Sequence, residues 1–425
     1  MKDLLNIQSN RRAFIKQLSQ LSMLSLVPAP SVTPFLTHRK IKSETEILTT
    51  GPKHHFFGYF GICPWNRDET HVLSLESNFH DHLPTTGESA LIGLVDVKTG
   101  KFEKLTQTTA WNLQQGAMMH WHPKYPNEKI LYNDFHNDQL ASVIMNINSG
   151  KKQYLPHPVS ALDHQGKHAL YISYGRTGRL RKVVGYQGLE DPNPDDPHPA
   201  NDGVFLMDLS TGESKLVVSI NQVYELIKDR HPELVDKPMW FNHTEFNDSG
   251  NRLFFVARTW NENNRLQTGM YTVNIDGSDL KEAIPYGKTV SHFDWRNDEQ
   301  ILATFNLRGQ GAEHVLFADG KSDYRSIGGE LLHFDGHCTF APNGNWLATD
   351  RNHGDTVSKS LWLYNLEEEE GQKLGDFPMK EKRYLGGDVR CDLHPRWNRS
   401  GNKICIDALN PKDWTRQIHI VHLDL

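Results

Sequence analysis

The stretch GHCTFAPNGNWLATD at residues 336–350 joins a histidine, an aromatic residue three positions later, a Pro/Asn/Gly turn and an apolar strand. Its other copies with a histidine begin at His122, His243, His292 and His394, and the copy with His122 and Tyr125 is slightly shortened. Two further copies, at Ile62 and Val159, keep an apolar anchor without the histidine. The chain therefore contains seven copies of one unit.

Self-similarity at a period of about 40 to 50 residues, built from short strands and turns, is typical of a β-propeller with one four-stranded blade per repeat. Alternating apolar residues that run into Asp/Ser/Thr-Gly turns, as at 95–100 and 207–212, predict the outer hairpins. We therefore expect an all-β fold, a single seven-bladed β-propeller over residues 45–425. The last copy lacks a fourth strand, so residues 46–50 are predicted to pair there and close the ring, because open sheet edges promote aggregation.

The chain begins with a segment that does not belong to the repeats. The sequence NRRAFIK at residues 10–16, followed by a mildly apolar stretch to residue 27, resembles a bacterial twin-arginine export signal. We therefore assign residues 1–38 to an export signal and linker, and expect the protein to be periplasmic or secreted. An amphipathic helix that begins with two arginines is the alternative.

Composition narrows the class of partner. The 46 basic and 52 acidic residues give a net charge of −6, which argues against nucleic-acid binding as the main function. No apolar run beyond the export signal is long enough to span a membrane, and we expect a monomer. The four cysteines have no CxxC spacing, which disfavours a zinc finger. Cys391 and Cys405 lie on neighbouring predicted strands and either pair or remain buried thiols.

The histidines recur at one phase of the repeat. The first strand of each blade lines the channel of a propeller, so the five repeated histidines are expected to converge near the axis. Three neutral imidazoles from consecutive blades match a divalent-metal site for manganese, zinc or calcium, and we assign His292, His337 and His394 as ligands. Asp392 shares a strand face with His394 and is expected to be a fourth ligand or to orient one. A buried polar network is the alternative.

The pattern across all seven blades, including Asn242-His243, Ser291-His292, Gly336-His337 and Leu393-His394-Pro395, resembles oligogalacturonate lyases and, more broadly, the seven-bladed lyases that include one group of ulvan lyases. The resemblance covers about residue 50 to the end. It implies a manganese-type metal held by three histidines and a glutamine, and His292 and His394 match two of these positions. Asp392 stands where the family has another histidine, and no residue matches the glutamine.

The resemblance makes an elimination reaction the leading hypothesis. β-Elimination from a uronate needs a positive group on the carboxylate, a base at C5 and an acid at the leaving oxygen. The candidates are His122 and His243 for the base, His136 and Tyr186 for supplying or relaying the proton, and Arg176 or Arg308 for the carboxylate.

The sequence therefore predicts an exported lyase that cleaves anionic, uronate-containing oligo- or polysaccharides. A glycoside hydrolase on the same scaffold is one alternative, but hydrolases need two carboxylates beside the bond, and only Asp294 and Asp392 are expected near the channel. A non-catalytic periplasmic binding propeller is another, because fold does not imply function. The repeated histidines argue against it.

Overall fold

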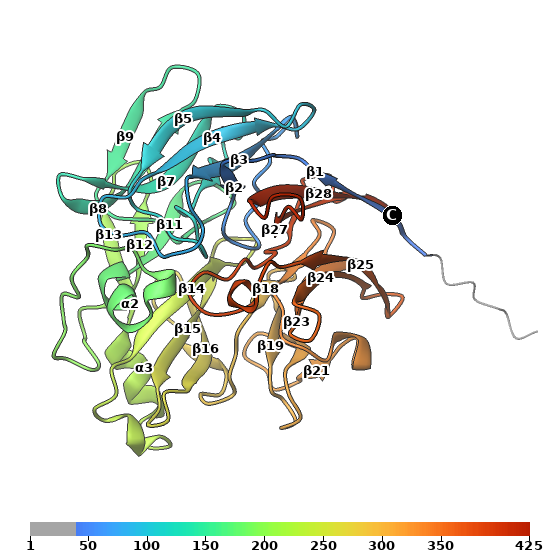
Figure 1. Ribbon diagram of the computed structural model, residues 1–425. Coiled ribbons are helices and arrows are strands. Elements are labelled where there is room, and N and C mark those ends of the chain that lie inside the picture. The colour runs from blue at the N-terminus through green and yellow to red at the C-terminus, as the bar shows by residue number, and fades with distance from the viewer. Residues whose placement is uncertain (1–39) are drawn as a thin grey trace, which may run out of the picture. The chain divides into compact units, whose positions relative to one another are not determined.

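The computed structural model describes residues 40–425, so the predicted export signal lies outside the described residues. Residues 41–425 form one compact unit. Seven four-stranded antiparallel sheets follow one another around a central channel (Figure 1). This is the seven-bladed propeller that the repeats predicted.

The strands of each blade are given from the channel outward. Blades one to three consist of β2 (His54–Phe56), β3 (His71–Ser77), β4 (Ala90–Asp96) and β5 (Phe102–Thr108); β6 (His120–Trp121), β7 (Lys129–His136), β8 (Gln139–Asn146) and β9 (Lys152–Leu155); and β10 (Ala161–Leu162), β11 (His168–Ile172), β12 (Gly203–Asp208) and β13 (Ser214–Ser219). Blades four and five consist of β14 (Trp240–Phe246), β15 (Arg252–Trp260), β16 (Leu266–Asn274) and β17 (Lys281–Ile284); and β18 (Phe293–Trp295), β19 (Gln300–Phe305), β20 (Glu313–Ala318) and β21 (Arg325–Ser326). Blades six and seven consist of β22 (Cys338–Phe340), β23 (Trp346–His353), β24 (Ser358–Asn365) and β25 (Glu370–Pro378); and β26 (Arg396–Trp397), β27 (Lys403–Leu409), β28 (Arg416–Asp424) and β1 (Lys42–Ile47).

The ring closes through both ends of the propeller. Strand β1 pairs antiparallel with β28 from Lys42 opposite Asp424 to Ile47 opposite His419, and Figure 1 shows the blue strand beside the dark red one. The predicted closure is confirmed, although the strand begins at residue 42 rather than 46. Its exposed sequence KSETEI suits an outermost strand, because charged side chains protect an edge from pairing with other chains.

Helices are few and lie in connections. Within residues 40–425, the α-helices are α2 (Tyr174–Leu180) and α3 (Ile220–Ile227), and the 3₁₀ turns are η1 (Lys182–Val184), η2 (Pro232–Leu234), η3 (Gly329–Leu332) and η4 (Lys382–Tyr384). Helix α3 begins with a capping box between Ser219 and Gln222, and its apolar face packs into the core. Among the described residues, no helix combines the length and the apolar composition needed to cross a membrane.

The four cysteines are all free thiols in the described chain. Cys405 lies beside Arg396, whose Nη2 is 3.4 Å from Sγ, and Cys391 is within 3.8 Å of the carbonyl oxygen of Asp407. The two residues that the sequence left as a candidate pair are therefore separate buried thiols.

In blades two and four to seven, the repeated anchor residue lies at the end of the innermost strand and is buried. In blade two this anchor is Trp121, which is 4% exposed, and not Tyr125, which is 44% exposed. The predicted alignment of this blade was therefore wrong by four residues. Met118, three residues before Trp121, occupies the position that His243, His292, His337 and His394 hold in later blades. His122 follows β6 and belongs to the turn.

Blade one departs from the repeat in a way that matters for the channel. Its innermost strand is β2, after which the chain leaves the sheet and returns only at Trp65, which forms an isolated bridge with Val72. The intervening segment begins at Phe57 and Gly58, whose N–H groups donate to the Asp407 carboxylate at 3.1 and 2.9 Å. Gly58 has a φ of 105°, and a Cβ there would lie 2.5 Å from a backbone nitrogen. The excursion carries Tyr59 and Phe60 into the channel.

Candidate active site

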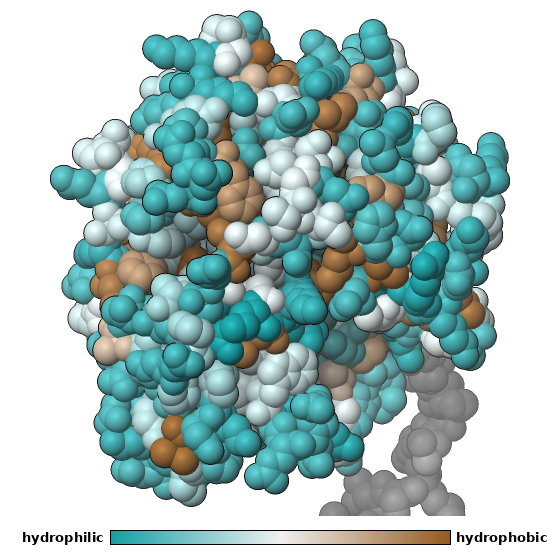
Figure 2. Space-filling view, turned by 60° about the vertical axis from the view of Figure 1, so that its left-hand side comes forward, coloured by the Kyte–Doolittle hydropathy of each residue, from teal (hydrophilic) through white to brown (hydrophobic). Residues whose placement is uncertain are grey.

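A cavity of about 390 Å³ lies at one end of the channel. We call it the histidine cavity, because one histidine from each of blades four to seven lines it: His243, His292, His337 and His394. Tyr59 and Phe60 line both this cavity and a second one. These two side chains therefore lie between the two ends of the channel. The face of the molecule in Figure 2 is mostly hydrophilic with scattered apolar residues.

Backbone conformation marks the repeated histidine position. His243 and His394 have φ values of 52° and 46°, and the equivalent Met118 has a φ of 48°. A left-handed conformation is costly for residues with a Cβ and persists only where the surroundings fix it. The shared strain supports the corrected alignment of blade two, since Met118, His243 and His394 adopt it at one repeat position.

Two of the histidines are each fixed by a carboxylate. Nδ1 of His292 lies 3.0 Å from Oδ1 of Asp335, and Nδ1 of His337 lies 3.0 Å from Oδ1 of Asp350. Burial lowers the pKa of His337, but the charge of Asp350 and its hydrogen bond outweigh that effect, so the pKa is raised. A carboxylate at Nδ1 fixes the ring and leaves Nε2 for a ligand. This is the arrangement found behind metal-binding histidines.

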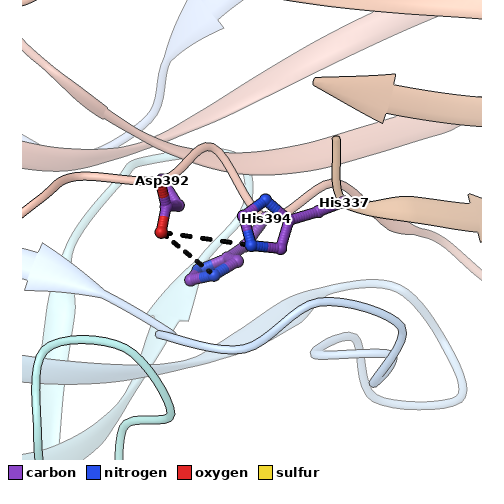
Figure 3. A group of neighbouring side chains, drawn as sticks. All are labelled: His337, Asp392 and His394. Carbon is purple, nitrogen blue, oxygen red and sulfur yellow. Dashed lines mark ion pairs between the residues drawn. The ribbon is translucent and has the colours of Figure 1, made fainter. Parts of the chain in front are cut away.

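Three side chains converge closely enough to hold a metal ion (Figure 3). Oδ2 of Asp392 lies 4.0 Å from Nε2 of His337 and 3.9 Å from Nε2 of His394. The His292 ring adjoins this group, with its centroid 3.9 Å from that of His337. Nδ1 of His394 is buried and has no hydrogen-bond partner among the described residues. Two imidazoles and a carboxylate fit a divalent ion such as manganese or zinc better than calcium, which prefers oxygen ligands.

Asp392 is also held by two cations. Nζ of Lys359 donates to Oδ1 at 2.6 Å, and Nε of Arg390 donates to Oδ2 at 2.7 Å. Burial raises the pKa of the Asp392 carboxyl, but Lys359 and Arg390 outweigh it and lower the pKa well below its usual range. Lys359 is 1% exposed. The carboxylate is therefore ionised and fixed in position, as a ligand must be.

Three guanidinium groups make the cavity suitable for an anion. Arg181, Arg258 and Arg390 all line it. Arg258 is 5% exposed, and its Nε has no hydrogen-bond partner among the described residues. Burial, followed by the nearby charge of Arg181, lowers the pKa of Arg258 to about 9. An unpartnered buried donor of this kind favours a ligand that supplies negative oxygens.

His243 faces the same cavity as a neutral base. Its Nδ1 lies 2.7 Å from the hydroxyl oxygen of Tyr59, and the two rings stack. Burial, followed by the charge of Arg258, lowers the pKa of His243 well below its usual range. Among the described residues Nε2 makes no hydrogen bond, so it is available to a ligand. A neutral imidazole oriented by a hydroxyl is suited to accepting a proton.

Two histidines predicted to act in catalysis lie elsewhere. His122 accepts a hydrogen bond from the backbone N–H of Lys124 and packs against Tyr125 in the turn after β6. His136 lies exposed at the end of β7 and stacks on Tyr154 with ring centroids 3.9 Å apart. Neither lines the histidine cavity. For His122 the reason is the misplaced anchor described above.

The other three candidates have structural partners. Arg176 donates to the backbone carbonyls of Met239, Asn193, Asp196 and Pro197 at 2.7 to 3.0 Å, so it fixes the proline-rich loop. The hydroxyl of Tyr186 is buried and accepts from Asn133 at 3.1 Å. The side chain of Arg308 is 58% exposed and pairs with Glu313. The structure thus does not bring Arg176, Tyr186 or Arg308 to the cavity.

Sequence reasoning missed the residues that do reach it from outside the repeat. Tyr59 and Phe60 come from the excursion in blade one, Arg181 follows α2, and Arg258 and Arg390 lie on β15 and before β26. None of the five falls at the repeated histidine position. Strand alternation does not point to Arg258, because it pairs with Trp240, which is three residues before His243 and separated from Glu245 by a register shift.

Comparisons with known proteins support the fold. A solved structure described as an oligogalacturonate lyase in complex with manganese is 12% identical, with a TM-score of 0.64 over 90% of this chain and 96% of that chain. An oligogalacturonate lyase from Vibrio parahaemolyticus is 13% identical, with a TM-score of 0.60 over 90% of this chain and 97% of that chain. No family model and no curated protein matches the sequence. At this identity the likeness concerns the fold.

Proposed function

We propose that the protein is a lyase that cleaves uronate-containing oligo- or polysaccharides by β-elimination in the histidine cavity. The observation that carries the proposal is the neutral, hydroxyl-oriented imidazole of His243 in one cavity with the guanidinium groups of Arg181, Arg258 and Arg390. The propeller shared with two oligogalacturonate lyases supports it. A proton acceptor beside an anion site is what elimination from a uronate requires.

The arginines account for substrate binding. A uronate carboxylate lies next to C5, and negative charge spreads onto it as the C5 proton leaves. Guanidinium groups bind carboxylates with two parallel hydrogen bonds, and in a buried site they stabilise developing charge strongly. Arg258 has an unpartnered Nε and lies in the same cavity as His243. We assign the carboxylate to Arg258 together with Arg181 or Arg390.

His243 is assigned as the base that removes the C5 proton. In this assignment Nδ1–H donates to the hydroxyl oxygen of Tyr59, which leaves the lone pair of Nε2 to receive the proton. The resulting imidazolium costs more here than in water because Arg258 is close. The bound carboxylate offsets that cost, since it adds a negative charge beside both groups. His243 is thus active only when an anionic substrate fills the cavity.

The group His337, Asp392 and His394 would hold the divalent metal, with His292 beside it. When bound, the metal supplies positive charge that polarises the uronate carboxylate. The carboxylates Asp335 and Asp350 orient the histidines, and Lys359 and Arg390 fix Asp392. All of these orienting contacts are made between residues of the protein and do not require the metal.

A hydrolase is less consistent with the site. The acids lining the histidine cavity are Asp335, Asp350 and Asp392, and each is already engaged by a histidine or by cations. Hydrolysis needs one carboxylic acid that stays protonated and a second free carboxylate. Since the pKa values of all three are lowered, none is a proton donor.

The test is ultraviolet absorbance of the unsaturated uronate that elimination produces. Metal-loaded and chelated protein would be mixed with pectic, ulvan-type and glucuronate-containing glycans. We expect absorbance to rise with at least one glycan, and His243→Ala to abolish it while the exposed His136→Ala retains it. No rise on any uronate with metal bound would overturn the proposal. It would shift the choice to a hydrolase, detected by new reducing ends, or to a binding propeller.

We also propose that the protein is exported and acts as a monomer in the periplasm or outside the cell. The support is the twin-arginine motif Arg11-Arg12 with Phe14 in the sequence. Cell fractionation of the full chain and of an Arg11→Lys, Arg12→Lys variant tests export. Retention of the variant in the cytoplasm is expected, and equal export of both would contradict it. Light scattering of the mature protein checks its mass.

A further inference from the structure

The opposite end of the channel contains a second cavity of different chemistry. Two adjoining hollows of about 370 and about 580 Å³ share Glu245, His164 and Arg399 in their lining. We call this region the carboxyl cavity, after Glu245 on β14 and Asp294 on β18. Each acid lies two residues after a histidine of the histidine cavity. The same innermost strands therefore supply both ends of the channel.

Glu245 and Asp294 form a pair without a counter-charge. Their side chains are hydrogen-bonded to each other, and Oδ2 of Asp294 also accepts from the backbone N–H of Phe340 at 2.6 Å. Among the described residues, neither carboxyl group forms an ion pair with a lysine or arginine. Burial, followed by the charge of Asp294, raises the pKa of Glu245 well above its usual range. Two adjacent carboxyl groups stay together by sharing a proton, as in this hydrogen bond, or by holding a cation between them.

Independent polar groups in the same cavity lack partners. His120 is 8% exposed, and its Nε2 has no hydrogen-bond partner among the described residues. Burial lowers the pKa of His120 to about 3, so the ring is neutral and can offer a lone pair. Nε1 of Trp295 is buried and also unpartnered. Orphaned buried groups are rare in folded proteins and indicate an occupant that completes them.

Other buried acids in the molecule show the contrast. Asp407 is paired with Arg396 at 2.7 Å and with Arg416 at 3.1 Å, and Asp392 is paired with Lys359. At these two positions the chain neutralises a buried carboxylate with its own cations. At the carboxyl cavity, Arg399 instead donates to the backbone carbonyl oxygens of Trp65 and Asn66. The pair is left to bind a cation from solution.

We propose that the carboxyl cavity binds a divalent cation through Glu245 and Asp294, with water molecules completing its coordination. Oxygen ligands and retained waters are what magnesium, manganese and calcium accept. A metal-bound water would donate a hydrogen bond to Nε2 of His120. This site is distinct from the group His337, Asp392 and His394, and it does not depend on the proposed lyase activity.

Terbium luminescence provides the test, with Tb³⁺ as the probe and Trp295 as the sensitising ring. Wild-type protein is expected to give saturable luminescence excited through tryptophan, reversed by excess Ca²⁺ or Mn²⁺. Trp295→Phe should remove most of the signal. Glu245→Gln should weaken Tb³⁺ binding about tenfold or more, because one of two charged ligands is lost.

The controls separate a site from a general surface effect. Asp248→Asn removes a carboxylate from the same cavity outside the pair and should change the affinity no more than about threefold. Glu245→Asp keeps the charge on a shorter side chain and should bind with intermediate affinity. The proposal is overturned if wild-type protein shows no saturable signal, or if Glu245→Gln and Asp248→Asn weaken binding equally. Thermal unfolding of each variant verifies that it is folded.

Discussion

The two ends of the channel have opposite electrostatic environments, although β14 and the segment leading into β18 contribute residues to both. At the histidine cavity each carboxylate is engaged, Asp335 by His292, Asp350 by His337, and Asp392 by Lys359 and Arg390. At the carboxyl cavity, Glu245 and Asp294 have only each other. From one end of the channel to the other, acids that are paired with histidines or cations give way to a pair of acids without such partners.

This difference predicts which mutations mainly affect folding stability and which mainly affect cation binding. A paired buried network is costly to break, because the partner of any removed group stays buried and uncompensated. An unpaired site is costly to leave empty and gains from a ligand. Mutations of the paired acids Asp335, Asp350 and Asp392 should therefore act first on folding, and mutations at the carboxyl cavity first on cation binding.

The largest effect is expected from Asp392→Ala. It leaves Lys359 buried without its carboxylate, which should lower the free energy of unfolding by about 3 to 5 kcal/mol. Urea denaturation measures the loss. The matched control is Asp376→Ala in blade six, whose partner Lys373 is exposed, with an expected loss below about 1 kcal/mol. Equal losses for the two variants would contradict a stabilising ion pair between Lys359 and Asp392.

Phe60→Ala removes part of the division between the two ends. Phe60 is 4% exposed and lies against the rings of His292, His337 and His394. The cavity created should cost about 3 kcal/mol in the free energy of unfolding, measured by urea denaturation. Metal bound at the histidine cavity should also be lost faster to a chelator. Tyr154→Ala, which truncates an exposed ring, serves as the control and should change neither quantity.

The sequence repeat explains which parts of the fold could be predicted from the sequence. Seven copies of one phrase determine the blade count, and the missing last strand determines the ring closure by residues 42–47. Both depend on strand periodicity, which sequence displays directly. The anchor of blade two was misassigned because Tyr125 and Trp121 are both aromatic, and only burial distinguishes them.

The candidate site was predictable only where it follows the repeat. Four histidines and Asp392 lie in the cavity because repeat phase fixes their direction. Tyr59, Arg258 and Lys359 come from an excursion and from paired strands, whose approach depends on tertiary packing. Arg176 was predicted to bind the carboxylate because of its charge. Its N–H groups instead donate to backbone carbonyl oxygens, and the sequence does not show that these carbonyls lie beside it.

The folded protein should lose stability at acidic pH because it contains buried histidines that are neutral in the folded state. His314 is fully buried behind the histidine cavity, where Nδ1 bonds the carbonyl of Leu332 and Nε2 bonds Thr349. Burial lowers its pKa from 6.5 to about 4. The unfolded chain therefore binds the proton more readily, and the stability that His314 contributes is present above pH 6.5 and lost as the pH falls toward 4. By about pH 5 the loss should be about 2 kcal/mol.

Urea denaturation across this pH range checks the prediction by comparing wild-type protein with His314→Gln. The variant is less stable near neutrality, but its stability should fall less steeply between pH 6.5 and 5. The exposed His136→Gln should follow the wild-type slope. Identical slopes for all three proteins would mean that His314 does not contribute to the acid sensitivity.

The smallest effect is expected where the two ends meet, at Tyr59→Phe. The change removes the hydroxyl that lies 2.7 Å from Nδ1 of His243 and leaves the ring in place. Unfolding free energy should fall by about 1 kcal/mol, the usual net value of one hydrogen bond. The chemical shifts of the His243 ring, followed by NMR, should show a change in tautomer populations. If the shifts are unchanged, Tyr59 does not orient the base, and the histidine cavity fixes His243 through packing against Phe293 and its strained backbone alone.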